Sequence, residues 1–372
     1  MSLTSVTARV CDRLVSRSMA TMSDSPPLLP QVMSFLTSFA PLHLAESWDN
    51  VGLLVEPLNP PPIKKALLTI DLTEDVMDEA VAANANLIIS YHPPIFQALK
   101  RITGDKWKER LVSRCLENKI ALFSPHTSWD AVKDGLSDWL ASPFDFAEKQ
   151  PILKSPGRLS NPAFSHHVNV FSHPPSALDD ALECERILNQ NGCKILSSSK
   201  IENQFKFQAI AQKESLSGLE ASLNNSSCIY NIYERVSVPL SDCGTGRVGK
   251  LKAAIKLSEA VEKIKKLVNM PQIRIALEKG KTMDSSVESV AVVAGSGASV
   301  LRGVRADLYV TGEMLHHDIL DANHCGSSVV LINHSDSERG YLSCFAPLLS
   351  QHFSGTLDVI ISQRDRDPIN IV

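Results

Sequence analysis

Several features that mark particular classes of protein are missing from this sequence. Basic residues are not in excess, because 37 Lys and Arg are set against 41 Asp and Glu and the net charge is −4. A nucleic-acid-binding domain normally carries a basic patch, so no direct binding of DNA or RNA is expected. No apolar run approaches the roughly 18 residues that a membrane-spanning helix needs, so no membrane partner is expected either.

Paired cysteines are also missing. The chain has eight Cys, but none of them forms a C-x-x-C pair. In a chain of 372 residues with 44% apolar composition, they are expected to be reduced thiols and not a disulfide framework or a Cys-zinc site. This length and composition predict two or three domains with a buried core. The protein is expected in the cytoplasm and the nucleus.

The first 25 residues differ from the rest of the chain. Arg9, Arg13 and Arg17 recur at a spacing of four, and Asp12 is the only acidic residue before Asp24. An Arg-rich, Ser-rich and acid-poor amphipathic stretch is typical of a mitochondrial transit peptide, and a disordered tail is the alternative. The sequence leaves both open, and with them a mitochondrial location.

Short apolar strands alternate with helical patterns in two parts of the chain. Strands are expected at 66–70, 87–90 and 120–123, and again at 289–294, 307–310 and 328–332. This alternation favours an α/β fold class, with two α/β lobes at 30–150 and 280–372 whose mainly parallel sheets are flanked by helices. Residues 157–272 lack the pattern and predict an inserted, smaller α+β domain. Within them, the stretch 244–249 has the spelling G-x-G-x-x-G, but it is better interpreted as a glycine-rich turn than as a dinucleotide-binding loop.

Polar clusters follow the predicted strands at four points. In open α/β sheets, ligands bind just outside the carboxyl ends of parallel strands, so these clusters are candidates for one site. Imidazole and carboxylate groups without Cys suit zinc, iron, manganese or magnesium, as one or two ions. The residues concerned are Tyr91 and His92 after the strand at 87–90, His126 and Asp130 after 120–123, Thr311, Glu313, His316 and His317 after 307–310, and His334 and Glu338 after 328–332.

Five motifs together resemble the Nif-three-like family, also labelled GTP cyclohydrolase I type 2. The resemblance covers about residues 30–140 and 285–372 and is nearest to the vertebrate members. The motifs are Ser47–Leu53 (SWDNVGL), Ile88–Phe96 (IISYHPPIF), His126–Asp130 (HTSWD), Tyr309–Glu313 (YVTGE) and His334–Gly340 (HSDSERG).

The resemblance implies a di-metal site between the two lobes. Carried over by position, its ligands are His92, Asp130, His334 and Glu338, with Glu338 as the bridging carboxylate and His126 beside them. Bacterial members have a second His directly before the residue that matches His92, where this chain has Tyr91. A neutral phenol is a poor substitute for imidazole, so one of the two metal positions is expected to be weakened or lost.

Other residues of the motifs have supporting interpretations. Asp49 is expected either to form a turn or to orient a ligand His, while Trp48 and Val51 are expected in the core. Thr311 and Glu313 are expected to orient His316 or a bound water. His316 and His317 are adjacent in sequence, so at most one of them is expected to face the site.

Two functional hypotheses follow from the resemblance, and a purely structural role ranks below both. Vertebrate members are associated with transcriptional co-repression through protein partners, including a subunit of the COP-nine signalosome, which implies a regulatory protein on a metal-binding scaffold. Bacterial members are associated with GTP-cyclohydrolase-like hydrolysis, which implies a metal-dependent hydrolase of a nucleotide or other heterocycle. The family also forms ring-like or dimeric assemblies, so a homo-oligomer is expected.

Overall fold

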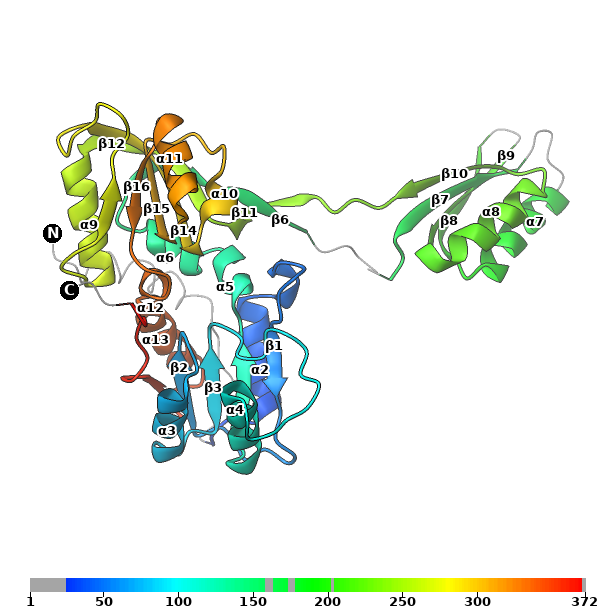
Figure 1. Ribbon diagram of the computed structural model, residues 1–372. Helices are drawn as coiled ribbons and strands as arrows, with labels where there is room; N and C mark the ends of the chain where they lie inside the picture. The colour runs from blue at the N-terminus through cyan, green and yellow to red at the C-terminus, as the bar shows by residue number, and fades with distance from the viewer. Residues whose placement is uncertain (1–24, 158–162, 173–177, 202–203, 370–372) are drawn as a thin grey trace. The chain divides into compact units, whose positions relative to one another are not determined.

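A computed structural model of the chain describes residues 25–157, 163–172, 178–201 and 204–369 (Figure 1). The expected transit peptide or tail at residues 1–25 therefore lies outside the described residues, apart from Ser25. The chain forms two compact units, of which the smaller comprises residues 156–239 and the larger the residues on either side. None of the helices in the described ranges is both long and apolar enough to cross a lipid bilayer.

The first sheet of the larger unit has five strands in the order β1-β4-β3-β2-β17. Strands β2, β3, β4 and β17 are parallel, and β1 pairs antiparallel with β4. Strands β2 to β4 are apolar along almost their whole length, as expected for parallel strands that are covered on both faces. The bounds are β1 Gly52–Val55, β2 Lys65–Thr69, β3 Leu87–Ser90, β4 Ala121–Ser124 and β17 Asp358–Ile361.

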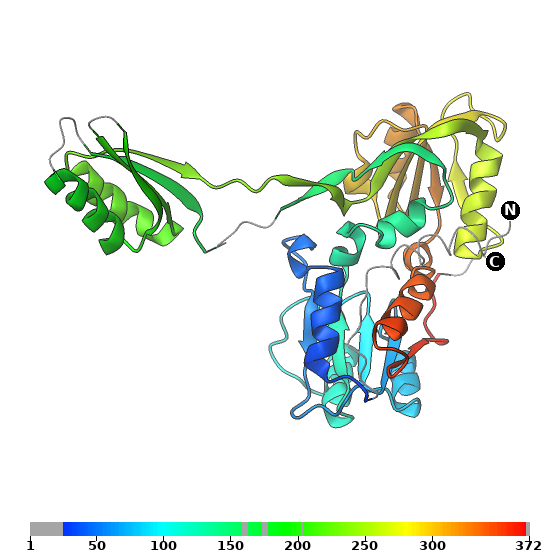
Figure 2. The ribbon, with the colours of Figure 1, turned by 180° about the vertical axis from the view of Figure 1, so that it is seen from behind.

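Helices cover both faces of this sheet, because successive strand residues point to opposite sides. Leu67 and Ile88 pack in one buried cluster with residues of α3 and α4. Leu68 and Ile89 pack in another with residues of α2 and α13, which lie together on one face in Figure 2. The bounds are α2 Leu29–Phe39, α3 Glu74–Ala82, α4 Trp107–Glu117 and α13 Leu342–His352.

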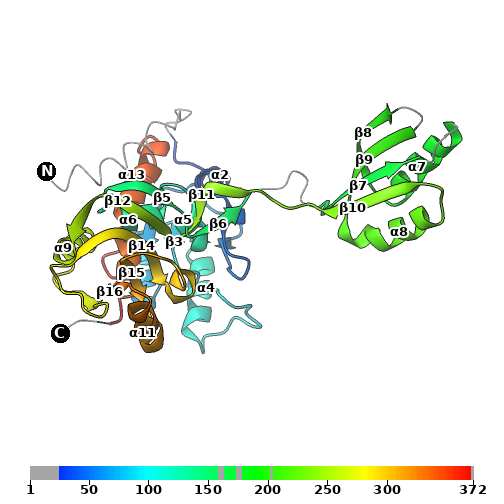
Figure 3. The same cartoon turned by 90° about the horizontal axis from the view of Figure 1, so that it is seen from above.

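The second sheet of the larger unit has six strands in the order β13-β16-β15-β14-β12-β5. Its centre, β14 to β16, is parallel, and β13, β12 and β5 pair antiparallel. Helices α6 and α9 pack on one face, and α10 and α11 pack on the other (Figure 3). The bounds are β5 Phe146–Gln150, β12 Arg247–Lys256, β13 Arg274–Ala276, β14 Ser286–Ser296, β15 Leu308–Glu313, β16 Ser328–Leu331, α6 Leu136–Ala141, α9 Leu257–Val268, α10 Ala298–Leu301 and α11 His316–His324.

Each of the two sheets has an outer strand from the part of the sequence that mainly forms the other sheet. β17, from the end of the chain, pairs with β2 of the first sheet, while β5 joins the second sheet beside β12. The expected lobes at 30–150 and 280–372 therefore do not coincide with the sheets, although the α/β fold class is confirmed. Register and sheet membership depend on long-range pairing, which local periodicity does not report.

The smaller unit is a four-stranded antiparallel sheet with two helices on one face. Its chain order is β-α-β-β-α-β and its strand order is β10-β7-β9-β8, which is the ferredoxin-like arrangement. Val168, Phe207 and Leu219 lie in its own buried core. The bounds are β7 His166–Phe171, α7 Leu178–Gln190, β8 Lys194–Ile201, β9 Gln204–Ala211, η2 Lys213–Ser215, α8 Leu216–Asn224 and β10 Ile229–Glu234.

The structure ends this unit at residue 239, whereas the sequence pattern suggested a domain from 157 to 272. Residues 240–272 contain β12 and α9, which belong to the six-stranded sheet and its cover. Strands β6 and β11 form a separate two-stranded sheet. Their bounds are β6 Leu153–Pro156 and β11 Pro239–Thr245.

The stretch 244–249 was predicted to be a glycine-rich turn, but most of it is strand: residues 244–245 end β11 and residues 247–249 begin β12. Only Gly246, with a φ of +65°, forms a bend between the two strands, and a strand rather than a helix follows it directly. The next residue, Arg247, is 2% exposed, and its Nη2 donates to Asp138 Oδ2 at 2.7 Å. Burial raises the pKa of Asp138, but Arg247 and Lys149 outweigh this effect and hold it below the ordinary value. The buried ion pair between Arg247 and Asp138 thus connects the start of β12 to α6.

Candidate metal centre

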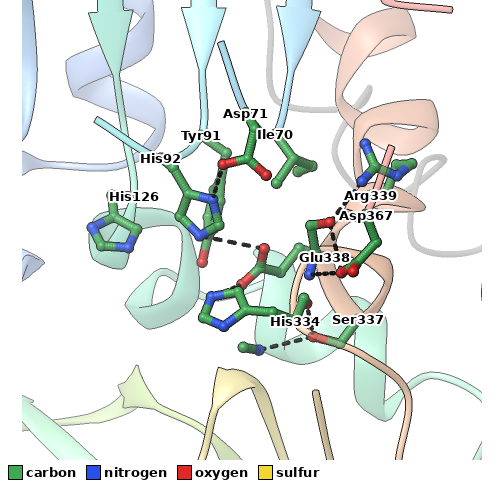
Figure 4. A network of polar contacts seen from close by, with 12 residues as sticks. Ile70, Asp71, Tyr91, His92, His126, His334, Ser337, Glu338, Arg339 and Asp367 are labelled. Atoms are coloured by element: carbon green, nitrogen blue, oxygen red, sulfur yellow. Dashed lines mark hydrogen bonds and ion pairs between the residues drawn. The ribbon is translucent and has the colours of Figure 1, made fainter. Parts of the chain in front are cut away.

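Two imidazoles and one carboxylate converge between the two sheets of the larger unit (Figure 4). His92 Nε2 lies 3.4 Å from Glu338 Oε2, and His334 Nε2 lies 3.5 Å from Glu338 Oε1. One potential ligand atom from each residue lies within 4.8 Å of the others. Three residues from two sheets thus present one N/N/O donor set.

Strand ends and a short helix position these three side chains. His92 follows the carboxyl end of β3, and His334 follows that of β16. Glu338 lies in the short helix α12, Asp336–Arg339, which begins between His334 and Glu338. That start lets residues four apart turn toward the same point, as the sequence pattern suggested.

Each imidazole is oriented by a second carboxylate. His92 Nδ1 lies 2.9 Å from Asp71 Oδ1, and His334 Nδ1 lies 2.9 Å from Glu313 Oε1. These contacts direct both Nε2 atoms toward Glu338. A carboxylate on the far nitrogen is the usual outer contact of a metal-binding histidine. Glu313 was expected to orient His316 or a water, and the structure places it on His334.

Asp71 has a role that sequence reasoning missed. In the structure, Thr73 caps α3 by accepting from the Val76 N–H, and Asp71 is left to contact His92. Burial raises the pKa of Asp71, but the hydrogen bond and charge of His92 outweigh this and lower it. A carboxyl residue two positions after a strand, beside a strand that ends in His, was the available signal.

The three donors pass a test of fit for a metal ion. Glu338 is 2% exposed, and no suitably directed hydrogen bond reaches its Oε2 from the described residues. A buried carboxylate oxygen without a hydrogen bond is costly, so a cation between Glu338 and the two imidazoles would stabilise it. Gly295 lies directly against two of the three donors, because a Cβ at this position would be 2.7 Å from Glu338 Oε1 and 3.0 Å from His334 Nε2. The donor set suits zinc, iron or manganese.

Electrostatics at His92 also favour positive charge. Burial lowers the pKa of His92, but Glu338 and Asp71 outweigh that effect and raise it well above the ordinary value. The same carboxylates that attract a proton would attract a cation. An imidazole that binds a metal ion must be neutral, so an ion at this position would displace any proton that His92 carries.

The fourth expected ligand, Asp130, lies apart from this donor set. It is in the short helix α5, Thr127–Ala131, and its Oδ1 accepts a hydrogen bond of 2.8 Å from the Tyr91 hydroxyl. Burial raises the pKa of Asp130 to about 6, although His126 and Tyr91 lower it. Burial, then Asp130 and Glu338, raise the pKa of Tyr91 well above its ordinary value, so the phenol keeps its proton. The structure thus brings together three of the four expected ligands and pairs Asp130 with Tyr91.

His126 lies beside the centre, as expected. Its ring centroid is 5.4 Å from that of His92, and its Nδ1 lies 2.7 Å from Asp49 Oδ1. Thr127 Oγ1 donates to the other oxygen of Asp49 at 2.5 Å. Asp49 therefore orients a histidine beside the donor set, and not a ligand histidine as one of its two interpretations expected.

Three further expectations have different outcomes. Trp48 was expected in the core, but it is 59% exposed, because the turn that buries Asp49 directs the indole outward. Thr311 is buried, and its hydroxyl donates to the Gly295 carbonyl at 3.2 Å, so it supports Gly295 and not His316. His316 and His317 begin α11, and both lie outside the donor set.

The C-terminal segment joins the two sides of the centre. Asp365 Oδ2 accepts from the Ile70 N–H at 2.7 Å, at the end of β2, and also pairs with Arg339 of α12. Asp367 Oδ2 accepts from the Ser335 N–H at 3.0 Å, next to His334 (Figure 4). These contacts hold the loops that carry the ligands.

Residues 28–368 match the family described as Duf34/NIF3 (NGG1p interacting factor 3). The "NIF3-like protein 1" of Bos taurus is 39% identical over 376 residues, covering 100% of this chain and 98% of that protein. The protein of the same name from Homo sapiens is 39% identical over 372 residues, covering 98% and 97%. The "GTP cyclohydrolase 1 type 2 homolog" of Bacillus subtilis is 29% identical and covers 81% and 86%.

Solved structures share the fold. A Bacillus cereus protein described as related to NIF3 superposes with a TM-score of 0.63 at 25% identity, covering 92% of this chain and 98% of that one. A Staphylococcus aureus protein superposes with a TM-score of 0.65 at 23% identity, covering 94% and 100%. The second likeness concerns the fold alone.

Proposed function

Because this chain belongs to the Duf34/NIF3 family, we propose that it binds a divalent transition-metal ion through His92, His334 and Glu338 and uses it in hydrolysis. One observation carries the proposal: the buried Glu338 carboxylate lies between two imidazole Nε2 atoms, each directed there by its own carboxylate. A purely structural core would not need this arrangement.

The surrounding groups suit hydrolysis of a nucleotide or other heterocycle. When bound, the ion supplies Lewis acidity and activates water. Asp130 has a pKa raised to about 6, which lets it accept or release a proton close to neutral pH. Tyr91 holds that carboxylate in place, and His126 lies within ring contact of both Tyr91 and His92. The Bacillus subtilis relative is named for a GTP cyclohydrolase, which supports hydrolysis of a nucleotide as the reaction class.

We propose one ion per chain and not two. The Tyr91 hydroxyl donates a hydrogen bond to one oxygen of Asp130, and Asp130 is not among the three residues whose potential ligand atoms converge. A Tyr91→His substitution would replace the donor hydroxyl by a ligating nitrogen. Metal analysis should then give up to two equivalents for the variant and one for the parent chain.

The binding proposal is tested by metal content. Purified protein should hold about one equivalent, and the double substitution His334→Ala, Glu338→Ala should remove it. The matched control is His316→Ala, His317→Ala, which deletes two exposed imidazoles outside the centre and should leave the metal content unchanged. Content below about a tenth of an equivalent in the parent chain, under conditions that preserve zinc and iron, would refute binding.

The hydrolytic proposal has its own test. Metal-loaded protein is incubated with GTP, and ring-opened product is followed by chromatography and mass spectrometry. Asp130→Asn should abolish product while leaving the metal content intact. Product that is unchanged by this substitution would come from a contaminant and count against the proposal.

A second candidate function is regulation through protein partners. The family description names interaction with another protein, and the ferredoxin-like unit at 156–239 offers a compact module outside the centre. We propose homo-oligomers and nuclear co-regulators, such as a COP-nine signalosome subunit, as partners. This role requires a nuclear pool of the protein, whereas a mitochondrial pool would depend on residues 1–25. A pull-down with the whole chain should recover such a partner, and failure under mild cross-linking would argue against co-repression.

A further inference from the structure

A line of aromatic rings leads from the metal centre to the surface. The ring centroids of His334 and His92 are 5.1 Å apart, and those of His92 and His126 are 5.4 Å apart. His126 is followed by Trp48 at 6.0 Å, and Trp48 by Phe96 at 6.0 Å. The last two rings, the Trp48–Phe96 pair, are 59% and 45% exposed. Large exposed aromatics beside a polar centre are a marker of ligand contact.

The Trp48–Phe96 pair stands on a fixed backbone. Asn50 Nδ2 donates to the Ile95 carbonyl at 2.5 Å, which ties the Trp48 turn to the segment that carries Phe96. Asp49 is held by His126 and by Thr127. The indole is therefore presented to solvent by a tethered turn, although burial of a Trp side chain would be favourable. An exposed, preorganised indole suits stacking against a planar ring.

Phe96 also lines a surface pocket of about 1030 Å³. The pocket is formed by residues 94–110, which connect β3 to the first turn of α4. A connection this long without its own helices or strands is usually functional. The pocket therefore begins at Phe96, which is also the last residue in the line of aromatic rings.

Positive charge predominates in this pocket, in contrast to the net charge of −4 for the chain. Its acids are Asp105 and Glu109, and Glu109 is engaged by Thr103 at 2.7 Å. Two of its cations form ion pairs: Arg110 with Glu74 at 2.8 Å, and Lys106 with Glu109 at 3.8 Å. An anion of two or three charges suits such a pocket. The five cations are Lys100, Arg101, Lys106, Lys108 and Arg110.

We propose that the Trp48–Phe96 pair and the 94–110 pocket bind a nucleoside phosphate. The base stacks on Trp48, its edge faces His126, and the phosphate contacts Lys100 and Arg101. A nucleoside phosphate has a planar base, which suits the exposed rings of the Trp48–Phe96 pair, and a negative charge, which suits the cations of the pocket. The orientation of the base toward the metal rests on the proposed function, whereas binding itself does not.

The test measures binding to the full chain by calorimetry after chelator treatment, with GMP, guanosine and ribose 5-phosphate as probes. GMP should bind more tightly than either fragment. Trp48→Ala should weaken GMP binding about tenfold or more, since stacking of one base on an aromatic side chain has this effect. Trp48→Phe should restore most of the affinity, because a flat ring is kept. Tyr233→Ala is the matched control, as it deletes a 55% exposed aromatic of the other unit.

Charge is tested separately. Lys100→Glu, Arg101→Glu should weaken GMP and ribose 5-phosphate and spare guanosine, and the exposed pair Lys279→Glu, Lys281→Glu should change nothing. The proposal is overturned if GMP does not bind at millimolar concentration, if guanosine binds as well as GMP, or if Trp48→Ala has no effect. Metal content is measured on the same preparations before chelator treatment and should equal that of the parent chain in every variant. Loss of nucleotide binding with normal metal content therefore separates this inference from the metal site.

Discussion

A methyl group added at Gly295 would test the metal cradle directly. In the Gly295→Ala variant, the new Cβ would lie 2.7 Å from Glu338 Oε1 and 3.0 Å from His334 Nε2, in the space where these atoms would face the proposed ion. Contacts below 3.0 Å force something to shift, and Glu338 is 2% exposed and fixed in α12. We expect the carboxylate to turn away from the two imidazoles.

The same substitution has a backbone cost that must be separated from its effect on the metal. Gly295 has a φ of +62°, and a left-handed residue with a Cβ costs roughly 1–2 kcal/mol. Gly303 provides the control, because its φ is +78° and a Cβ there meets nothing within 4 Å. In urea unfolding of the metal-free protein, Gly303→Ala should therefore show the backbone cost alone, and any further loss of stability in Gly295→Ala reports the displacement of Glu338.

Of the two variants, only Gly295→Ala should bind metal more weakly than the parent chain. Competition with a chromophoric chelator should show Gly295→Ala binding zinc about 10–100-fold more weakly, the range known for displaced supporting groups at metal sites. Gly303→Ala should bind zinc as the parent chain does. Equal zinc affinity in all three proteins would refute the reasoning, because it would mean that Glu338 and His334 do not hold the ion on the side of Gly295.

Three other perturbations have defined outcomes. Asp138→Asn should destabilise the protein by about 3–5 kcal/mol at pH 7 in urea unfolding, because the buried Arg247 guanidinium loses its charged partner. The lowered pKa of Asp138 means that its stabilisation is complete above its ordinary pKa near 4 and is lost as the pH falls through the lower folded value, so parent and variant stabilities should converge below about pH 4. Tyr91→Phe should cost about 1–3 kcal/mol and raise the pKa of Asp130 further above about 6, which infrared titration of the carboxyl band would show. Chelation of a bound ion present at a hundred times its dissociation constant should lower unfolding stability by about 2.7 kcal/mol, and no change in the melting temperature would mean that the native state holds no ion.

Local sequence patterns predicted the strand ends well. Short apolar runs followed by histidines and acids located His92 and His334, because parallel strands deliver their carboxyl ends to one edge. The i,i+4 spacing of His334 and Glu338 predicted their convergence. These features depend on a few neighbouring residues, so periodicity and spacing report them.

Contacts between distant segments were not predictable in the same way. The pairing of Asp71 with His92 needs the register of β2 against β3, and that of Glu313 with His334 needs β15 beside β16. Asp130 was assigned by resemblance, and only the fold showed its hydrogen bond with Tyr91. Trp48 was placed in the core on hydrophobicity, which does not show which way a turn directs its side chain.

The return of the chain end to the first sheet has a consequence for biosynthesis. β17 completes that sheet beside β2, and Asp365 and Asp367 then secure Ile70 and Ser335 on the two sides of the metal centre. While the ribosome is still translating the chain, β2 is left as an open apolar edge that can pair with other chains. Asp365 and Asp367 can make these contacts only after the segment that follows β17 has emerged. We therefore expect metal to be loaded late, and we expect a product truncated before β17 to bind metal poorly and to aggregate.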